Sequence, residues 1–307
     1  MTSELSPPPD GTIAASTTPR VFIGLPVYNG ARFLEEALDS LLAQSYRDFT
    51  LLISDNASTD STQSICREYA ARDARIRYVR QPSNIGAPRN WNFVTKEAEG
   101  DYFKWATGND LVAPDMLARC VAALDADPAA SLSQGRTCLM DEDSGACKEY
   151  EKDLALLDDR PTDRLKQLAM KLGLNNGQSG LIRLSMLRKT RMERLYPNGD
   201  IALMAELALL GKFIVLPEVL LYRRMGATTF SCLLRGDQRG QFYGNQAMQP
   251  LVGHQLKLHL DVVRATLTLP LPWSERLSAF IFSLRYLSWN KSQIWAEFRQ
   301  ALGSQKA

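Results

Sequence analysis

The chain has 307 residues, room for one large domain and a smaller appendage, since single hydrophobic cores stop growing at about 250–300 residues. Hydrophobic residues make up 45% and charged residues 23%, which excludes a mostly disordered or fibrous protein. The net charge of +2 lacks the strongly basic footprint of a nucleic-acid-binding surface, so we expect no nucleic-acid partner.

Cysteine usage and the N-terminal segment bear on the compartment. The five cysteines are scattered without CxxC spacing, which indicates neither a zinc site nor a disulfide framework and fits a reducing compartment. The first 20 residues do not have the pattern of a secretory signal, and no window reaches the roughly 18 apolar residues of a membrane span. We expect a cytoplasmic protein, either free or peripheral at the inner face of the membrane.

An alternation of strands and helices begins after a polar tail. Residues 1–19 have almost nothing to bury and predict a disordered tail. Residues 20–25 form an apolar run ending at Pro26, typical of a buried parallel strand. Apolar residues then recur at helical spacing from Phe33 to Leu42.

The same alternation continues along the chain. Further strand-like runs occupy residues 49–54, 76–79 and 102–106. A helix follows each of them, and the starts are marked by the capping residues of DNASTDS, by Pro88 and by Pro114. This order predicts an α/β fold with a mostly parallel central sheet and helices on both faces.

The second half of the chain is less regular. Beyond residue 130 the pattern weakens, until residues 200–224 predict a helix from Ile201 to Leu210, a stop at Gly211 and two strand-like runs. We therefore expect a main domain over residues 20–230.

A C-terminal helical appendage is expected over residues 231–307. A Gly- and Gln-rich linker at 236–249 leads into apolar residues at helical spacing, which predict amphipathic helices. These helices either pack on the core or, with Trp289 and Trp295 nearby, make a peripheral membrane contact or a homo-oligomer interface.

Polar residues follow each predicted strand. Parallel α/β sheets bind ligands beyond the carboxyl ends of their strands, near a switch in strand order. The residues at these positions are Tyr28 and Asn29, Asp55 and Asn56, 84–90, and 107–110. The sequence thus predicts one ligand site made from these four segments.

Five ordered motifs carry a resemblance to a known family. They are IGLPVYNG (23–30), LLISDNASTD (51–60), NIGAPRNWN (84–92), GDYFKWATGNDLVAPDML (100–117) and GDIALMAELALLGKF (199–213). Together they resemble the inverting family-2 glycosyltransferases over about two thirds of the chain. The resemblance implies a GT-A, Rossmann-like fold, a nucleotide-sugar donor and a role in polysaccharide biosynthesis.

The first two motifs would bind the nucleotide base. Tyr28 offers a stacking surface and Asp55 or Asn56 an acceptor for a ring N–H, and Pro26 belongs to the same motif. By resemblance Asn56 stands where a carboxylate usually meets the uracil ring. Its amide oxygen is a weaker acceptor, and capping of the following helix is a compatible second role.

The third and fourth motifs would hold the diphosphate. Asn84 and Arg89 lie in a loop that Pro and Gly keep irregular, and an arginine there can grip a diphosphate with two N–H groups. Gly108, Asn109 and Asp110 take the place of the metal-binding DxD motif, so only Asp110 is acidic. We expect Mg²⁺ or Mn²⁺ at Asn109 and Asp110 with lowered affinity, since an amide brings no charge.

Asp200 is the candidate general base that deprotonates the acceptor hydroxyl, as the resemblance implies, with a helix N-cap as the structural alternative. The leading hypothesis is an inverting, hexosyltransferase-like enzyme that moves sugar from a UDP- or dTDP-linked donor to a glycan or lipid-linked acceptor. A catalytically degenerate glycosyltransferase-like protein that binds nucleotide or glycan, or serves as a scaffold, is the second hypothesis. A nucleotidyltransferase is the third, although LPVYNG makes a poor phosphate loop.

Overall fold

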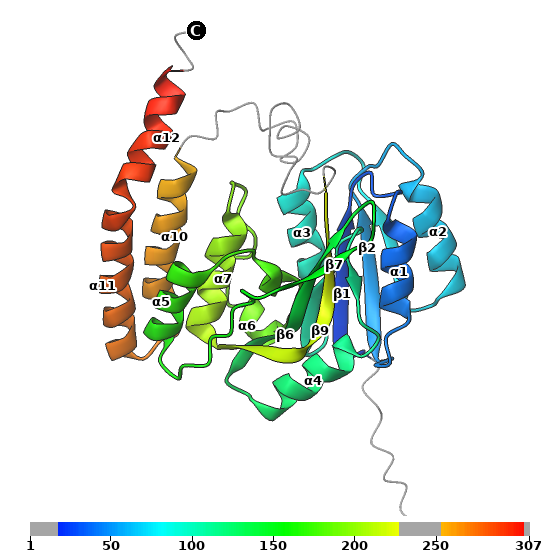
Figure 1. Cartoon of the computed structure of the whole chain (residues 1–307), viewed down its shortest axis with the longest axis horizontal. Helices are drawn as coiled ribbons and strands as arrows, with labels where there is room; N and C mark the ends of the chain where they lie inside the picture. The colour runs from blue at the N-terminus through cyan, green and yellow to red at the C-terminus, as the bar shows by residue number, and fades with distance from the viewer. Residues whose placement is uncertain (1–17, 227–252, 304–307) are drawn as a thin grey trace, which may run out of the picture.

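The computed structural model describes residues 18–226 and 253–303. Nearly all of the predicted tail and all of the predicted linker at 236–249 lie outside these ranges. Within them, one sheet of nine strands has the order β3-β2-β1-β4-β8-β6-β9-β5, with β7 paired to β6 (Figure 1). The strands are β1 (Val21–Val27), β2 (Phe49–Asp55), β3 (Ile76–Arg80), β4 (Tyr102–Trp105), β5 (Leu111–Val112), β6 (Ala130–Asp141), β7 (Cys147–Tyr150), β8 (Leu181–Arg183) and β9 (Lys212–Met225).

The half of the sheet formed by β3, β2, β1 and β4 is parallel, as predicted. Strands β1 and β2, in the middle of this half, are mostly apolar because both of their faces are covered. In β1, Phe22 belongs to one core cluster and Ile23 to the other; in β2, Leu52 and Ile53 divide in the same way. Beyond β4 the sheet is mixed, since β8 runs antiparallel to both β4 and β6.

Helices cover both faces of the sheet, which confirms the predicted α/β class (Figure 1). One core cluster takes residues from α1, α2 and α4, and the other takes residues from α3, α5, α7, α10 and α11. The helices are α1 (Leu34–Leu42), α2 (Thr62–Arg72), α3 (Ala87–Lys96), α4 (Met116–Ala126), α5 (Pro161–Lys171), η1 (Asn176–Ser179, a 3₁₀ turn), α6 (Leu184–Leu187), α7 (Gly199–Leu210), α10 (His254–Thr268), α11 (Trp273–Trp289) and α12 (Lys291–Gly303). No helix in the described ranges is long and apolar enough to cross a membrane.

The expectation of two separate strands after Gly211 is corrected. The two strand-like runs after Gly211 form one strand, β9, because the register beside β6 shifts around Pro217 instead of breaking. The Pro217 carbonyl accepts a hydrogen bond from Arg136 Nε at 2.8 Å, so the irregularity is a bulge that stays attached to its neighbour.

A disulfide was also not expected. Cys138 of β6 and Cys147 of β7 are joined by one, with Cα atoms 5.8 Å apart. Sequence spacing gave no sign of this pair, because antiparallel pairing of β6 with β7 brings the two residues together. Of the other cysteines in the described ranges, Cys66 and Cys120 are free and buried.

The strand order places a switch point between β1 and β4. The chain adds β2 and β3 on one side of β1 and then returns to lay β4 on the other side. At such a point the connections leave in opposite directions and open a crevice beyond the strand ends. The segments that follow β1 and β4, which contain Tyr28 and Asn109, therefore flank the crevice.

Candidate active site

The turns after β1 and β2 are tied to each other. Asn29 donates its backbone N–H to Ser58 Oγ at 2.9 Å and accepts from the Thr59 N–H at 2.8 Å. Gly30 N donates to Thr62 Oγ1 at 2.9 Å. Tyr28 lies in this linked pair of turns, partly buried and directly beyond the end of β1.

Asp55 and Asn56 are both buried, with 0% and 2% of their surfaces exposed. Asp55 accepts hydrogen bonds from Ser58 N at 2.8 Å and from the Tyr78 hydroxyl at 3.0 Å, so its carboxylate fixes the turn. The Asn56 side chain accepts from Ile85 N at 2.9 Å. Asn56 thus joins β2 to the loop before α3 and forms no cap on α2.

The loop before α3 is shaped by Asn84 and Gly86. Asn84 Oδ1 accepts from Asn56 Nδ2 and from Gly86 N, each at 2.8 Å. Gly86 has φ +84°, a left-handed conformation that suits glycine, and it is the N-cap of α3. Arg89 follows in the first turn of α3, where the helix N-terminus adds positive potential. Two predicted diphosphate contacts therefore sit at one helix start.

The triplet after β4 lies against β1 and β9. A Cβ placed on Gly108 would lie 3.3 Å from Val27 Cγ2, so this residue is close to the end of β1. Asp110 Oδ1 accepts from Arg224 N at 2.9 Å, and the Asn109 carbonyl accepts from Arg224 Nε at 2.9 Å. Burial raises the pKa of Asp110.

These contacts decide how well the triplet fits a divalent cation. No group of three or more His, Cys, Asp or Glu side chains that could hold a metal occurs in the described part of the chain. The one carboxylate of the triplet, Asp110, is engaged by the main chain of Arg224, and the guanidinium of Arg224 lies against Asn109. The residues present do not fit a metal site built from protein carboxylates.

Asp200 lies in the first turn of α7 and is partly buried. The N-cap of this helix is Asn198, with φ 64°, so the N-cap alternative for Asp200 is corrected. Asp200 Oδ2 accepts from Asn175 Nδ2 at 2.8 Å, which fixes the orientation of the carboxylate. A carboxylate held in one orientation can act as a general base.

A second carboxyl group, Glu193, lies near Asp200. Burial and the negative charge of Asp200 raise the pKa of Glu193 well above its usual range. Gln178 Nε2 donates to Glu193 Oε2 at 3.2 Å. Glu193 thus holds its proton to higher pH than an ordinary glutamic acid does, beside the candidate base.

Glu193 also connects α3 to the region around Asp200. Its backbone N donates to Asn92 Oδ1, and Asn92 Nδ2 donates back to its carbonyl, both at 2.9 Å. Asn92 is one turn beyond Arg89 on α3. The helix that carries Arg89 is therefore joined by a pair of hydrogen bonds to the loop that precedes the candidate base.

The pH dependence of stability tests the state of Glu193. Its folded-state pKa lies above the usual 4.5, so from that pH up to the folded-state pKa the folded chain binds more protons than the unfolded chain. Stability contributed by this group therefore falls as pH rises through that window. We expect Glu193→Gln to be more stable than the wild type at pH 8 by a larger margin than at pH 5, measured by urea unfolding. The exposed substitution Glu68→Gln is the control, and an equal margin at both pH values would refute the raised pKa of Glu193.

Several residues around the site were missed by sequence reasoning. They are Lys104, Asn175, Gln178, Glu193 and Arg224. Lys104 is buried in β4, where burial lowers its pKa to about 8, and its ammonium donates to the Ser179 carbonyl of η1. An acid or amide in an irregular segment carries no periodic signal. Of these residues, only Lys104 and Arg224 lie in segments for which the sequence predicted a motif or a strand, at 100–117 and 200–224.

Comparison with known proteins shows similarity to glycosyltransferases. The sequence profile described as glycosyl transferase family 2 matches residues 22–145. The putative glycosyltransferase EpsE of Bacillus subtilis is 36% identical over 108 residues, covering 35% of this chain and 39% of EpsE. An uncharacterized glycosyltransferase of Rickettsia felis is 31% identical over 169 residues, covering 53% of this chain and 27% of that protein. The chain thus spans well under half the length of these curated relatives.

Solved structures extend the likeness beyond the profile. Staphylococcus aureus TarS 1-349 in complex with UDP superposes with a TM-score of 0.60 at 15% identity, covering 88% of this chain and 72% of that one. The mannosyltransferase PcManGT of Pyrobaculum calidifontis, in complex with GDP-Man and Mn²⁺, gives 0.54 at 17% identity, covering 95% and 82%. At such identity the likeness shows the fold, and it confirms the GT-A architecture.

Proposed function

Residues 22–145 match the profile of glycosyl transferase family 2, and from that similarity we propose that the chain moves a sugar from a nucleotide-diphosphate donor to a hydroxyl of a glycan or lipid-linked acceptor, with inversion. One observation carries the proposal. Hydrogen bonds join the turns of the first three motifs, from Asn29 to Ser58 and from Asn56 to Asn84, and Asn92 of the third motif joins them to Glu193, whose carboxyl group lies near Asp200.

The donor nucleotide is assigned to the turns after β1 and β2. Tyr28 would stack on the base, while the turn held by Asp55 and Asn56 presents acceptors to it. Pro26 and Gly108 would contact the nucleotide through their main chain at the switch point. A pyrimidine donor, UDP- or dTDP-linked, is supported by TarS, whose structure holds UDP.

The leaving diphosphate is assigned to the start of α3. Asn84 and Arg89 would bind its oxygens, aided by the N–H groups of the first helical turn. Asn109 and Asp110 would face the same group from the other side of the crevice. Because the triplet lacks a second carboxylate, we infer that any contribution of Mg²⁺ or Mn²⁺ to donor binding is weak.

Asp200 is assigned the proton-transfer step. An acceptor hydroxyl would attack the anomeric carbon on the face opposite the nucleotide, and the Asp200 carboxylate would take its proton. Asn175 would keep that carboxylate in place, because its Nδ2 donates to Oδ2. The raised pKa of Glu193 would reduce the negative charge beside the Asp200 carboxylate.

Nucleotide binding provides the direct test. We expect UDP to stabilise the protein in a thermal-shift assay more than GDP does, with little change on adding Mn²⁺. Tyr28→Ala should weaken UDP binding about three- to tenfold through loss of stacking, whereas Tyr28→Phe should keep it within about twofold. Equal UDP affinity of Tyr28→Ala and the wild type would count against the assigned base site.

A second candidate function is a catalytically degenerate, nucleotide- or glycan-binding scaffold. The observation that favours it is the altered triplet, in which Arg224 contacts both Asn109 and Asp110. Stabilisation by UDP without transfer to any glycan or lipid-linked acceptor, with and without Mn²⁺, would select this reading. Turnover of a UDP- or dTDP-sugar would exclude it.

A further inference from the structure

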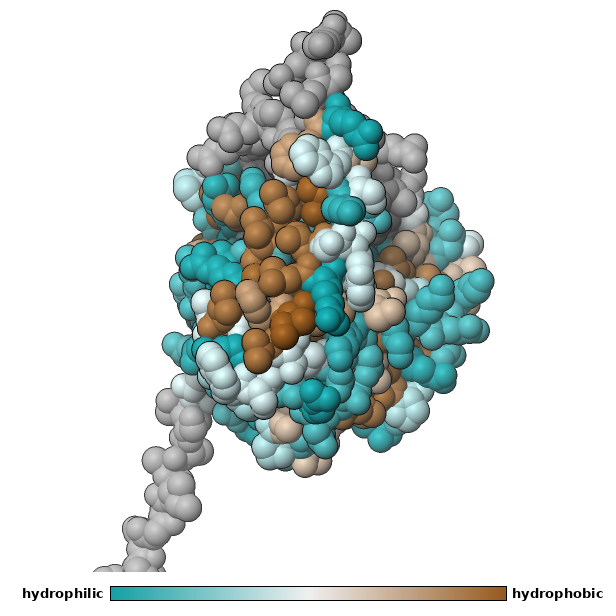
Figure 2. Space-filling model, turned by 90° about the vertical axis from the view of Figure 1, so that its left-hand side faces the viewer, coloured by the Kyte–Doolittle hydropathy of each residue, from teal (hydrophilic) through white to brown (hydrophobic). Residues whose placement is uncertain are grey.

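The outer face of α11 exposes a row of large apolar side chains. Trp273, Leu277, Ile281 and Leu284 have 76%, 51%, 42% and 42% of their surfaces exposed. Their spacing of four, four and three residues puts them on one side of the helix. Figure 2 shows an apolar strip running along this side of the molecule. We call these four residues the apolar strip.

The strip is not needed to hold α11 in place. The opposite side of the helix buries residues such as Ala279 and Phe282, which join the core shared with α5, α7 and α10. The Tyr286 hydroxyl donates to the Ala169 carbonyl of α5 at 3.1 Å, which attaches the same side. Exposed apolar rows of this kind on a folded protein mark a contact with something else.

Two tryptophans extend the apolar character beyond the strip. Trp289 at the end of α11 and Trp295 in α12 each expose 64% of their surface. The tryptophan side chain combines an apolar ring system with a polar N–H group. It is therefore enriched at the headgroup level of a bilayer, between the apolar interior and water. A flat helical face with tryptophans near its end fits a planar partner.

The acidic and basic side chains of α10–α12 lie on different sides of these helices. These helices contain the basic residues Lys257, Arg264, Arg276, Arg285, Lys291 and Arg299, and the acidic residues Asp261, Glu275 and Glu297. Every acid is turned inward: Asp261 pairs with Arg191 and Arg194, Glu275 with Arg160, and Glu297 with His254.

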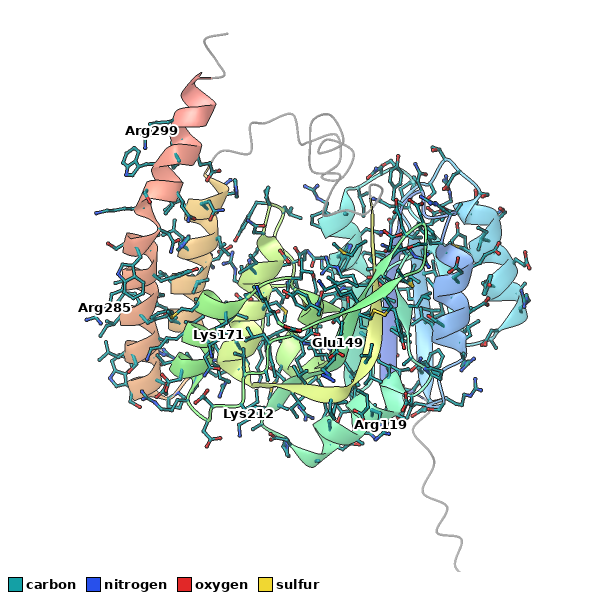
Figure 3. The ribbon with its side chains drawn as sticks, viewed as in Figure 1. Arg119, Glu149, Lys171, Lys212, Arg285 and Arg299 are labelled. Carbon is teal, nitrogen blue, oxygen red and sulfur yellow. A yellow bond between two sulfur atoms is a disulfide. The ribbon has the colours of Figure 1, made fainter. Side chains whose placement is uncertain are left out.

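The basic side chains of Arg285, Lys291 and Arg299 are turned outward. Across the described ranges, no ion pair involves Arg285, Lys291 or Arg299, and all three are exposed. Figure 3 shows Arg285 and Arg299 on the outer side of α11 and α12. The apolar strip is therefore flanked by positive charge that nothing in the described structure neutralises.

We propose that the apolar strip, with Trp289, Trp295 and the basic residues beside it, docks on the surface of an anionic lipid bilayer with α11 lying in the interface plane. Apolar burial and attraction to anionic headgroups are the two forces that hold such a helix. A second copy fits less well, because a two-fold interface would bring the same basic residues of both copies together. This docking goes beyond the proposed function and needs no sugar transfer.

Vesicle co-sedimentation of the full chain tests the proposal. The wild type should bind vesicles of phosphatidylcholine with 30% phosphatidylglycerol at least tenfold more tightly than vesicles of phosphatidylcholine alone, and binding should weaken as salt is raised. Leu277→Glu with Ile281→Glu should lower binding to the anionic vesicles at least tenfold, and Arg285→Glu with Arg299→Glu should do the same.

The controls change matched residues away from this face. Leu157 is an apolar side chain with 58% of its surface exposed, and Arg119 lies on α4 (Figure 3). Leu157→Glu and Arg119→Glu should bind as the wild type does, and circular dichroism should show that all variants are folded. Equal binding to neutral and anionic vesicles, or no binding by the wild type, overturns the proposal. So does a dimer in sedimentation velocity that Leu277→Glu with Ile281→Glu converts to a monomer, because the strip then faces a second copy.

Discussion

Asp200→Asn is expected to lower the rate of sugar transfer about 10³-fold while UDP affinity stays within about twofold of the wild type. Loss of a positioned general base typically costs 10²- to 10⁴-fold in rate. Asparagine keeps the size of the side chain and can still accept the hydrogen bond from Asn175, so the site geometry is retained. Initial rates with a UDP- or dTDP-sugar, beside UDP titration, give the two numbers.

A matched control separates chemistry from helix stability. Asp163 occupies the first turn of α5, as Asp200 does in α7, and both favour the positive end of their helices. Asp163→Asn should cost the same few tenths of a kcal/mol to about 1 kcal/mol in stability and leave transfer unchanged. A rate for Asp200→Asn above about one tenth of the wild-type rate would place the base elsewhere.

Arg194→Met is expected to lower the free energy of unfolding by about 3–5 kcal/mol, the usual cost of leaving one partner of a buried ion pair alone. Arg194 Nη2 lies 2.6 Å from Glu206 Oε1, and the side chains are only 6% and 2% exposed. Burial raises the pKa of Glu206, and the Arg194 charge opposes that rise. Without Arg194 the carboxyl group stays buried against Arg191 N alone. Urea unfolding at neutral pH measures the loss.

The double substitution Arg194→Met with Glu206→Leu measures how much of that lost free energy comes from leaving Glu206 buried without its partner. Replacing a buried pair by apolar residues is often close to neutral, so the double variant should be more stable than Arg194→Met alone. The exposed pair of Arg119 and Glu218, 3.4 Å apart, provides the comparison. Arg119→Met should cost less than about 1 kcal/mol. A loss below 1 kcal/mol for Arg194→Met would show that the buried pair contributes little.

Arg194 also forms a second ion pair, which joins helix α10 to the loop that precedes the candidate base. Arg194 Nε also lies 3.2 Å from Asp261 Oδ2 of α10, and the Tyr196 hydroxyl donates to the same oxygen at 2.6 Å. Both Arg194 and Tyr196 belong to the loop that leads into α7 and Asp200. Helix α10 therefore holds that loop through one carboxylate, so its packing bears on the site.

The first half of the fold was readable from the sequence because its signals are local. Strands β1 and β2 are continuous apolar runs, and the helices between them have regular apolar spacing. Strand β6 was missed, although it is the longest neighbour of β9. Its polar residues hide it: Ser131 and Ser133 are fully buried, and Ser131 Oγ donates to the Leu207 carbonyl of α7. Such a polar residue can be buried in a strand only when a residue that is distant in the sequence accepts its hydrogen bond.

By itself the sequence determined the order of the five motifs, the α/β class and the identity of the unusual Gly108-Asn109-Asp110 triplet, because strand and helix periods and motif spacing are written along the chain. The tertiary structure alone decided which residues surround the chemistry. It placed Glu193 beside Asp200 and against Asn92, 101 residues away, and Arg224 against Asn109, 115 residues away. Such contacts depend on how distant elements pack, and no local period encodes that packing.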